Sequence, residues 1–138
     1  MSRRLAREAA MCLLFERDMT GEAGEDTLRE MEDVLHTAQI EAQHESYINK
    51  ILALYDKNHE ELDSIIERYC RSWKLDRLPR VDISILRLAM IELLYLKDEV
   101  PKKVAINEAV ELAKKFSHEK APKFINGVLG AFVADEEP

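Results

Sequence analysis

The stretch RVDISILRLAMIELLYL, residues 80–96, is apolar on nearly every side when it is drawn as a helix. A helix that is apolar all round has to be covered by other elements of the fold. Pro79 stands directly before the stretch, at a place where helices tolerate proline. We therefore expect residues 80–96 to form the central helix of the protein.

Helical patterns continue on both sides of this central segment. Upstream, apolar residues recur at helical spacing in four segments, which we expect to be helices: about 3–19, 27–38, 44–57 and from Asn58 onward. Asn58 has Glu61 three residues later, the pattern of a capping box at a helix start. Downstream, Pro101 and Pro122 stand at the starts of two more helices. Since no alternating strand pattern occurs, the sequence predicts an all-α protein of about seven helices.

The composition is that of one globular domain. The 138 residues are 46% hydrophobic and 34% charged. No apolar run approaches roughly 18 residues, the length that spans a membrane, and the N-terminus lacks the pattern of a signal peptide. Cys12 and Cys70 fall in apolar helical patterns, which is typical of reduced, buried thiols. We expect a cytoplasmic protein without a membrane partner.

The reactive residues argue against an enzyme. No two of the four histidines have metal-ligand spacing, and the two cysteines are far apart in the chain. The four glycines are scattered, so they form no glycine-rich phosphate loop. Glu108 and Glu111 lie one helical turn apart, an arrangement that is usually a solvated face. We expect no catalytic residue, no cofactor and no metal.

Charge is distributed unevenly along the chain, whose net charge is −7. Residues 21–67 carry thirteen acidic and three basic side chains, whereas residues 68–134 carry eight acidic and thirteen basic ones. This distribution predicts two surfaces of opposite sign, and the alternative is the ordinary charge variation of a soluble protein.

The first helix begins with three arginines, although cations are mildly disfavoured at a helix N-terminus. Arg3, Arg4 and Arg7 fall within an arc of about 100°. The same arc continues into an apolar strip: Met11, Leu14 and Phe15. The expected core stripe lies on the opposite side: Leu5, Ala9, Cys12 and Leu13. Guanidinium groups beside an aromatic ring are typical of single-stranded RNA recognition. The alternative is that the apolar strip packs on another helix and the arginines are only solvated.

The last helix has a face of polar and small residues opposite its buried stripe. These residues would let another backbone or a nucleotide approach closely, and close helix packing is the commoner reason for them: Lys123, Asn126, Gly127 and Gly130. Phe124 stands at the edge of the buried stripe, and we expect its ring to be partly exposed. Its neighbour Ile125 is expected in the core.

Three stretches of the chain resemble one family. VPKKVAINEAVELAKKFS (residues 100–117), followed by KFINGVLGAF (residues 123–132), resembles the C-terminal signature of the NusB family of bacterial transcription antitermination factors. RRLAREAAMCLLFE (residues 3–16) resembles the arginine-rich first helix of that family, and residues 80–96 resemble its central helix. The resemblance covers the helical part of the chain and is weakest between about 21 and 45.

The resemblance implies a fold of two packed helical bundles, here about 1–75 and 76–134. It also implies binding to box A sequences of single-stranded RNA, as a heterodimer with NusE, a ribosomal protein of the small subunit. That complex joins elongating RNA polymerase and suppresses termination, notably in ribosomal RNA operons. Some members of the family form homodimers.

The resemblance also carries residue roles onto this chain. The expected RNA contacts come from the first helix and the KFING block, which would lie near one surface: Arg3, Arg4, Arg7, Phe15, Lys123, Phe124 and Asn126. The expected NusE contacts are charged residues at and before the central helix: Asp76, Asp82, Arg87 and Glu92. Lys120 stands where the relatives carry an acid, which departs from the family pattern in the loop before the last helix.

Two alternative functions belong to other classes. One is a protein-only or self-associating helical adaptor, in which a homodimer contact would cover the first helix. The other is a stand-alone relative of the RNA-binding domain of ribosomal RNA cytosine methyltransferases. Because no Rossmann domain or catalytic cysteine motif precedes Pro138, we expect the methyltransferase activity itself to be absent unless the chain is a fragment.

Overall fold

The computed structural model describes residues 3–20, 42–71 and 73–136, and all regular structure in them is helical. Its elements are, in chain order, α1 (Arg3–Thr20), α3 (Ala42–Tyr69), the 3-10 helix η1 (Leu75–Arg77), α4 (Arg80–Tyr95), α5 (Lys102–Phe116) and α6 (Ala121–Glu136). The prediction of an all-α fold is confirmed.

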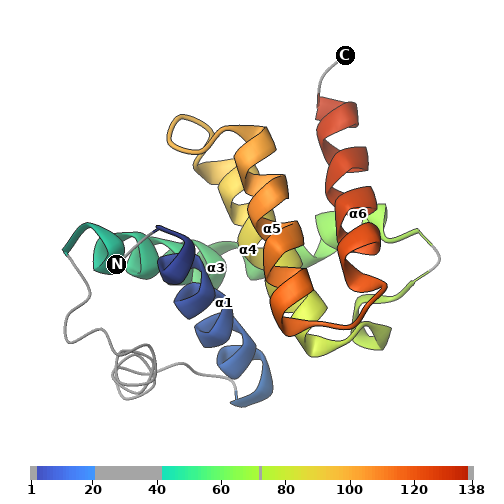
Figure 1. The fold of residues 1–138 in the computed structure, drawn as a ribbon, viewed down its shortest axis with the longest axis horizontal. Coiled ribbons are helices and arrows are strands. Elements are labelled where there is room, and N and C mark those ends of the chain that lie inside the picture. The colour runs from blue at the N-terminus through green and yellow to red at the C-terminus, as the bar shows by residue number, and fades with distance from the viewer. Residues whose placement is uncertain (1–2, 21–41, 72, 137–138) are drawn as a thin grey trace.

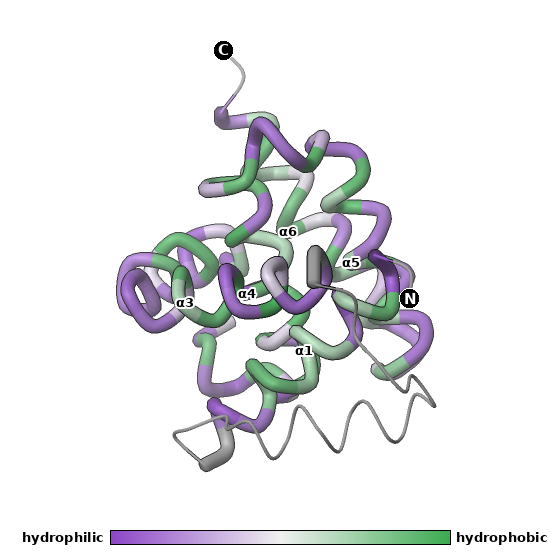
Figure 2. The backbone as a smooth tube through the Cα atoms, turned by 90° about the vertical axis from the view of Figure 1, so that its left-hand side faces the viewer, coloured by the Kyte–Doolittle hydropathy of each residue, from purple (hydrophilic) through white to green (hydrophobic). Residues whose placement is uncertain are grey.

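The helix α4 forms the centre of the molecule, as the apolar stretch predicts. Every residue from Asp82 to Leu93 is buried. α1, α3, α5 and α6 all pack against α4, and Figure 1 shows α4 and α5 between α1 on one side and α6 on the other. Figure 2 shows hydrophobic and hydrophilic residues alternating along α3, which covers the core with one face only.

The prediction of about seven helices is wrong, because the described residues contain five α-helices. Asn58 does not start a helix: it lies inside α3, where its side-chain amide donates to the carbonyl of Leu54 at 3.0 Å. Ile51 and Leu62, on either side of Asn58, are both fully buried. Since they are eleven residues apart, about three turns, one apolar stripe continues through the expected break. The helix expected over 27–38 lies outside the described residues.

The expected core stripe of the first helix is only partly correct, because Ala9 and Leu13 are buried as expected but the core extends beyond that stripe. Met11 and Leu14, placed on a side that the core does not need, are 2% and 0% exposed. Leu5 and Cys12, expected in the core, are only partly buried. The physical reason is that α1 packs against both α3 and α4, so that a wide arc of its surface is covered.

Both cysteines are free thiols, as predicted. Cys70 is buried and Cys12 is partly buried. Burial raises the pKa of Cys12 and raises the pKa of Cys70 to about 11. Both groups are therefore neutral and weakly nucleophilic near pH 7.

Candidate nucleic-acid and protein interfaces

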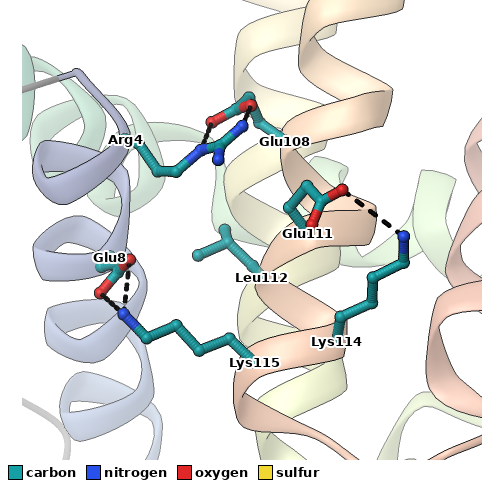
Figure 3. Close-up of a pocket in the computed structure, with 7 residues that line it drawn as sticks. All are labelled: Arg4, Glu8, Glu108, Glu111, Leu112, Lys114 and Lys115. Atoms are coloured by element: carbon teal, nitrogen blue, oxygen red, sulfur yellow. Dashed lines mark hydrogen bonds and ion pairs between the residues drawn. The ribbon is translucent and has the colours of Figure 1, made fainter.

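The guanidinium group of Arg4 forms a two-point ion pair with Glu108 of α5. Arg4 Nε lies 3.0 Å from Glu108 Oε1, and Arg4 Nη2 lies 2.7 Å from Glu108 Oε2. Figure 3 shows the two side chains pointing toward each other from α1 and α5. The Arg4 side chain is nevertheless 59% exposed, and its hydrogen bonds lower the pKa of the Glu108 carboxyl. Arg4 is thus a cation that solvent reaches and that an anionic partner could share.

Arg7, one turn further along α1, is buried. Its Nε lies 3.1 and 2.9 Å from the two carboxylate oxygens of Glu92 on α4. The hydroxyl of Tyr47 on α3 donates to the same carboxylate at 2.7 Å, and burial raises the pKa of that hydroxyl. Arg7, Glu92 and Tyr47 therefore form a satisfied internal network that joins three helices.

Arg3 lies at the edge of this network. Its guanidinium carbon is 4.3 Å from the centroid of the Tyr47 ring, which is a cation–π contact. The Tyr47 ring, fixed by Glu92, thereby orients Arg3 at the end of α1. Arg3 and Arg4 are the accessible cations of the first turn, and Arg7 holds the supporting structure.

A groove of about 340 Å³ runs between α1 and α5 beside Arg4. Each of its other cations has a carboxylate partner, as Figure 3 shows: Lys115 Nζ lies 2.9 Å from Glu8, and Lys114 Nζ lies 3.5 Å from Glu111. The groove is thus nearly neutral, and an anion that binds there has to share a cation with its carboxylate or displace that carboxylate.

The expected RNA contacts do not lie on one surface. Phe15 is partly buried on α1, eleven residues from Arg4, which is about 16 Å along a helix axis. Lys123 and Asn126 are exposed on α6, on the other side of α4 and α5 from α1 (Figure 1). The expectation that the KFING block lies near the arginines is therefore wrong, because the two central helices separate them.

The residues singled out on α6 differ in burial and in the space around them. Phe124 is partly buried against the core and Ile125 is fully buried, so the expected exposure of both residues is confirmed. Apart from chain neighbours and the nearby backbone of α6 itself, no heavy atom of the described residues lies within 4 Å of a Cβ built on Gly127 or Gly130. Close helix packing is therefore not the reason for these two glycines.

Three of the four residues expected to contact NusE are buried beside internal partners. Asp82 accepts a hydrogen bond from the Ser117 hydroxyl and lies 3.2 Å from His118 Nε2, in the connection between α5 and α6. Glu92 belongs to the Arg7 network at the other end of α4.

Arg87 is the third buried residue of this set. It donates to both carboxylate oxygens of Asp63, at 2.9 and 2.8 Å, and to Asp18 at 3.0 Å. Asp76 is exposed on η1 and shares a groove with Arg87. The four residues therefore do not form one charged patch.

Three residues at these surfaces were missed or undervalued by the sequence analysis. Glu108 looked like half of a solvated acidic pair, and Tyr47 was not singled out within the helix expected over 44–57. Trp73, which is 54% exposed beside Phe124, had no motif around it. The sequence offered one clue for Trp73. A single tryptophan close to charged residues, here Arg71 and Lys74, is not typical of a buried core position.

The described residues hold no group of three or more histidine, cysteine or acidic side chains arranged to bind a metal ion. Within the same part of the chain, no helix combines the length and the apolar character needed to cross a membrane.

Comparison with known proteins gives consistent matches over nearly the whole chain. The sequence model described as the NusB family matches residues 4–134. The transcription antitermination protein NusB of Alkaliphilus oremlandii is 46% identical over 136 residues, which cover 99% of this chain and 96% of that protein. The protein of the same name from Clostridium botulinum (strain Loch Maree) is 43% identical, over 96% of this chain and all of its own length.

Solved structures match the fold equally well. A structure of NusB from T. maritima has a TM-score of 0.85 at 32% identity, and the match covers 100% of this chain and 94% of that one. A structure of the antitermination factors NusB and NusE in complex with double-stranded RNA has a TM-score of 0.80 at 34% identity, with 96% of each chain covered.

Proposed function

This chain belongs to the NusB family, and we propose that it is a transcription antitermination factor that binds box A-type single-stranded RNA as a heterodimer with NusE. In that role it joins elongating RNA polymerase and promotes processive transcription of ribosomal RNA operons. The protein acts by binding and not by catalysis, in keeping with its family.

The observation that carries the proposal is the accessible pair of guanidinium groups at the start of α1. Arg4 is held by Glu108 yet is 59% exposed, and Arg3 is oriented by the Tyr47 ring. Guanidinium groups bind phosphate through two parallel hydrogen bonds, and this geometry matches the one that Arg4 already makes with a carboxylate. An RNA phosphate can therefore take the place of Glu108 on Arg4.

The other expected RNA-contact residues have supporting roles in the proposed site. Arg7 positions Arg3 through Glu92 and Tyr47. Phe15, with the α6 residues Lys123, Phe124 and Asn126, would extend the RNA contact away from the arginine end.

For NusE, we propose a docking surface around η1 and the start of α4. Asp76 is exposed there and is available for a charged contact. Asp82 acts indirectly, because its bonds to Ser117 and His118 hold the connection between α5 and α6 that carries Lys120. Arg87 braces the middle of α4 through its contacts with α1 and α3.

The proposal is tested by titrating labelled box A RNA with the protein alone and with the protein plus NusE. We expect NusE to raise the RNA affinity, because the heterodimer offers more contacts to one strand. An Asp76→Lys change should slow NusE association, whereas the exposed Asp98→Lys, a control with the same charge change after α4, should not. RNA affinity that is indifferent to NusE would contradict the heterodimer, and equal effects of the two variants would move the docking surface elsewhere.

A further inference from the structure

Trp73 is the most exposed large hydrophobic side chain among the described residues. It is 54% exposed and stands in the connection between α3 and η1. Neighbouring Phe124 of α6 is partly buried, and the two aromatic side chains line the same groove, which has a volume of about 320 Å³. An exposed indole beside a second aromatic ring is a candidate binding surface, since the solvated part of the tryptophan contributes nothing to the fold.

The charged residues that line this groove are both basic: Arg71 and Lys123. Both are exposed, and neither side chain has a hydrogen-bond or ion-pair partner among the described residues. Arg71 also has a backbone φ of 59°, which is unfavourable for a residue with a Cβ. The adjoining groove is lined by Arg68 and Lys74 and also by Glu67, whose carboxylate lies 3.9 Å from Lys74 Nζ.

This groove differs in kind from the one beside Arg4. In the Arg4 groove each cation already has a carboxylate partner. At Trp73 the two lining cations are unpaired within the described part of the chain, so a polyanion can bind without displacing an internal partner. The groove is also open at Gly127, where no heavy atom outside the neighbouring backbone of α6 lies within 4 Å of a built Cβ in the described residues.

The groove has three aromatic side chains, of Tyr69, Trp73 and Phe124, together with two unpaired cations and an open glycine. This combination matches the chemistry of single-stranded RNA. Bases stack on aromatic faces without regard to sequence, and cations beside the rings hold the phosphates. We propose that Trp73 and Arg71 extend the RNA contact of α6, with an unpaired base stacked on Trp73 and the flanking phosphates bound by Arg71 and Lys123. This inference rests on the proposed RNA-binding function, which already assigns Lys123 and Phe124 to RNA, and it adds Trp73 and Arg71 on the side of α4 and α5 away from Arg4.

The chain itself supplies the probe, because Trp73 is its single tryptophan. We expect a 12-nucleotide single-stranded RNA to quench the tryptophan fluorescence of the full chain saturably. The Arg71→Ala/Lys123→Ala variant should lower the salt slope of that binding by about 1.4, since each single-strand phosphate contact contributes about 0.7. Trp73→Ala should weaken binding of labelled RNA about 5- to 100-fold, the range for loss of one stacking ring, and Trp73→Phe should restore most of it.

The matched control is Phe116→Ala. Phe116 is 38% exposed, and Lys115 Nζ lies 5.3 Å from its ring centroid, so it is another exposed ring beside a cation. We expect this variant to bind RNA as the unmodified chain does. Because Trp73 is exposed, Trp73→Ala should keep its melting temperature, which shows that any loss of binding is not a loss of folding.

The outcomes separate this inference from the proposed function. If Trp73→Ala binds RNA normally while Arg4→Ala does not, the Trp73 contact is overturned and the function stands. If the fluorescence is quenched and Arg4→Ala has no effect, the Trp73 contact stands and the arginine end loses its role. Equal quenching by inorganic polyphosphate or by duplex RNA of the same length would overturn stacking, since neither offers an unpaired base.

Discussion

Arg4 and Arg7 differ in burial although they stand one turn apart on α1. The side chains of Arg7 and Glu92 are 7% and 1% exposed, and they form an ion pair with each other. Removing one partner of such a pair leaves a buried charge without compensation. We expect Arg7→Ala to lower the free energy of unfolding by about 3–5 kcal/mol in urea denaturation, whereas Arg4→Ala should leave it nearly unchanged.

The control for the buried pair is the double variant Arg7→Ala/Glu92→Gln, which removes the stranded charge. It should recover part of the lost stability, because a neutral amide is cheaper to bury than an unpaired carboxylate. Equal stabilities of Arg4→Ala and Arg7→Ala would contradict the assignment of Arg7 as a positioning residue.

Glu108 competes with RNA phosphate for Arg4 in the proposed site. Replacing Glu108 by Gln removes the negative charge and frees the guanidinium group, so RNA affinity should rise. The contact is partly solvated, and we expect an increase of about 2- to 5-fold. Glu111→Gln is the matched control, since Glu111 pairs with Lys114 and not with Arg4. A fall in affinity on Glu108→Gln would show that Glu108 holds Arg4 in its binding position.

The arginine end could be predicted from residues 3–7, because three cations at a helix start are conspicuous in an acidic chain. Which arginine is buried could not be predicted, since that depends on Glu92 and Tyr47 from distant parts of the sequence. One physical clue was present. Asp82, Arg87 and Glu92 stand in a stretch that is apolar all round, and charges in such a helix must find internal partners.

At the scale of elements, the continuity of α3 shows where local signals fail. Asn58 and Glu61 have the spacing of a capping box, but the apolar stripe on either side of them keeps helical register. Tertiary packing of that stripe decides the outcome, because burying Ile51 and Leu62 on α3 outweighs one capping bond. The helices at residues 80–96 and 102–116 were predictable because their patterns have no such competing signal.

The assignment of Asn58 to the interior of α3 can be tested directly. A helix-capping asparagine costs about 1 kcal/mol when replaced by alanine. Inside a helix, the same change should leave the free energy of unfolding unchanged or raise it by up to about 0.7 kcal/mol, because alanine has the higher helix propensity. A urea denaturation of Asn58→Ala distinguishes the two, and a loss near 1 kcal/mol would indicate a helix break at this position.

At the scale of the molecule, the acidic net charge does not prevent RNA binding, because accessible basic residues lie on two sides of the central helices. Arg3 and Arg4 lie at the end of α1, and Arg71 and Lys123 lie between the end of α3 and α6, with α4 and α5 separating the two sets (Figure 1). The uneven charge along the sequence predicted surfaces of opposite sign. It could not predict that the basic residues would divide between two opposite surfaces, since helix packing sets that separation.

The central claim is that Arg3 and Arg4 bind RNA phosphate. The most direct measurement is the salt dependence of box A RNA binding, in the presence of NusE, for the unmodified chain and for Arg3→Ala/Arg4→Ala. The control is Lys97→Ala/Lys103→Ala, which removes two exposed cations outside both grooves. We predict that the arginine variant binds more weakly and that its slope of log affinity against log salt is smaller by about 1.4, with no such change in the control. Affinity and slope equal to those of the unmodified chain would contradict the claim.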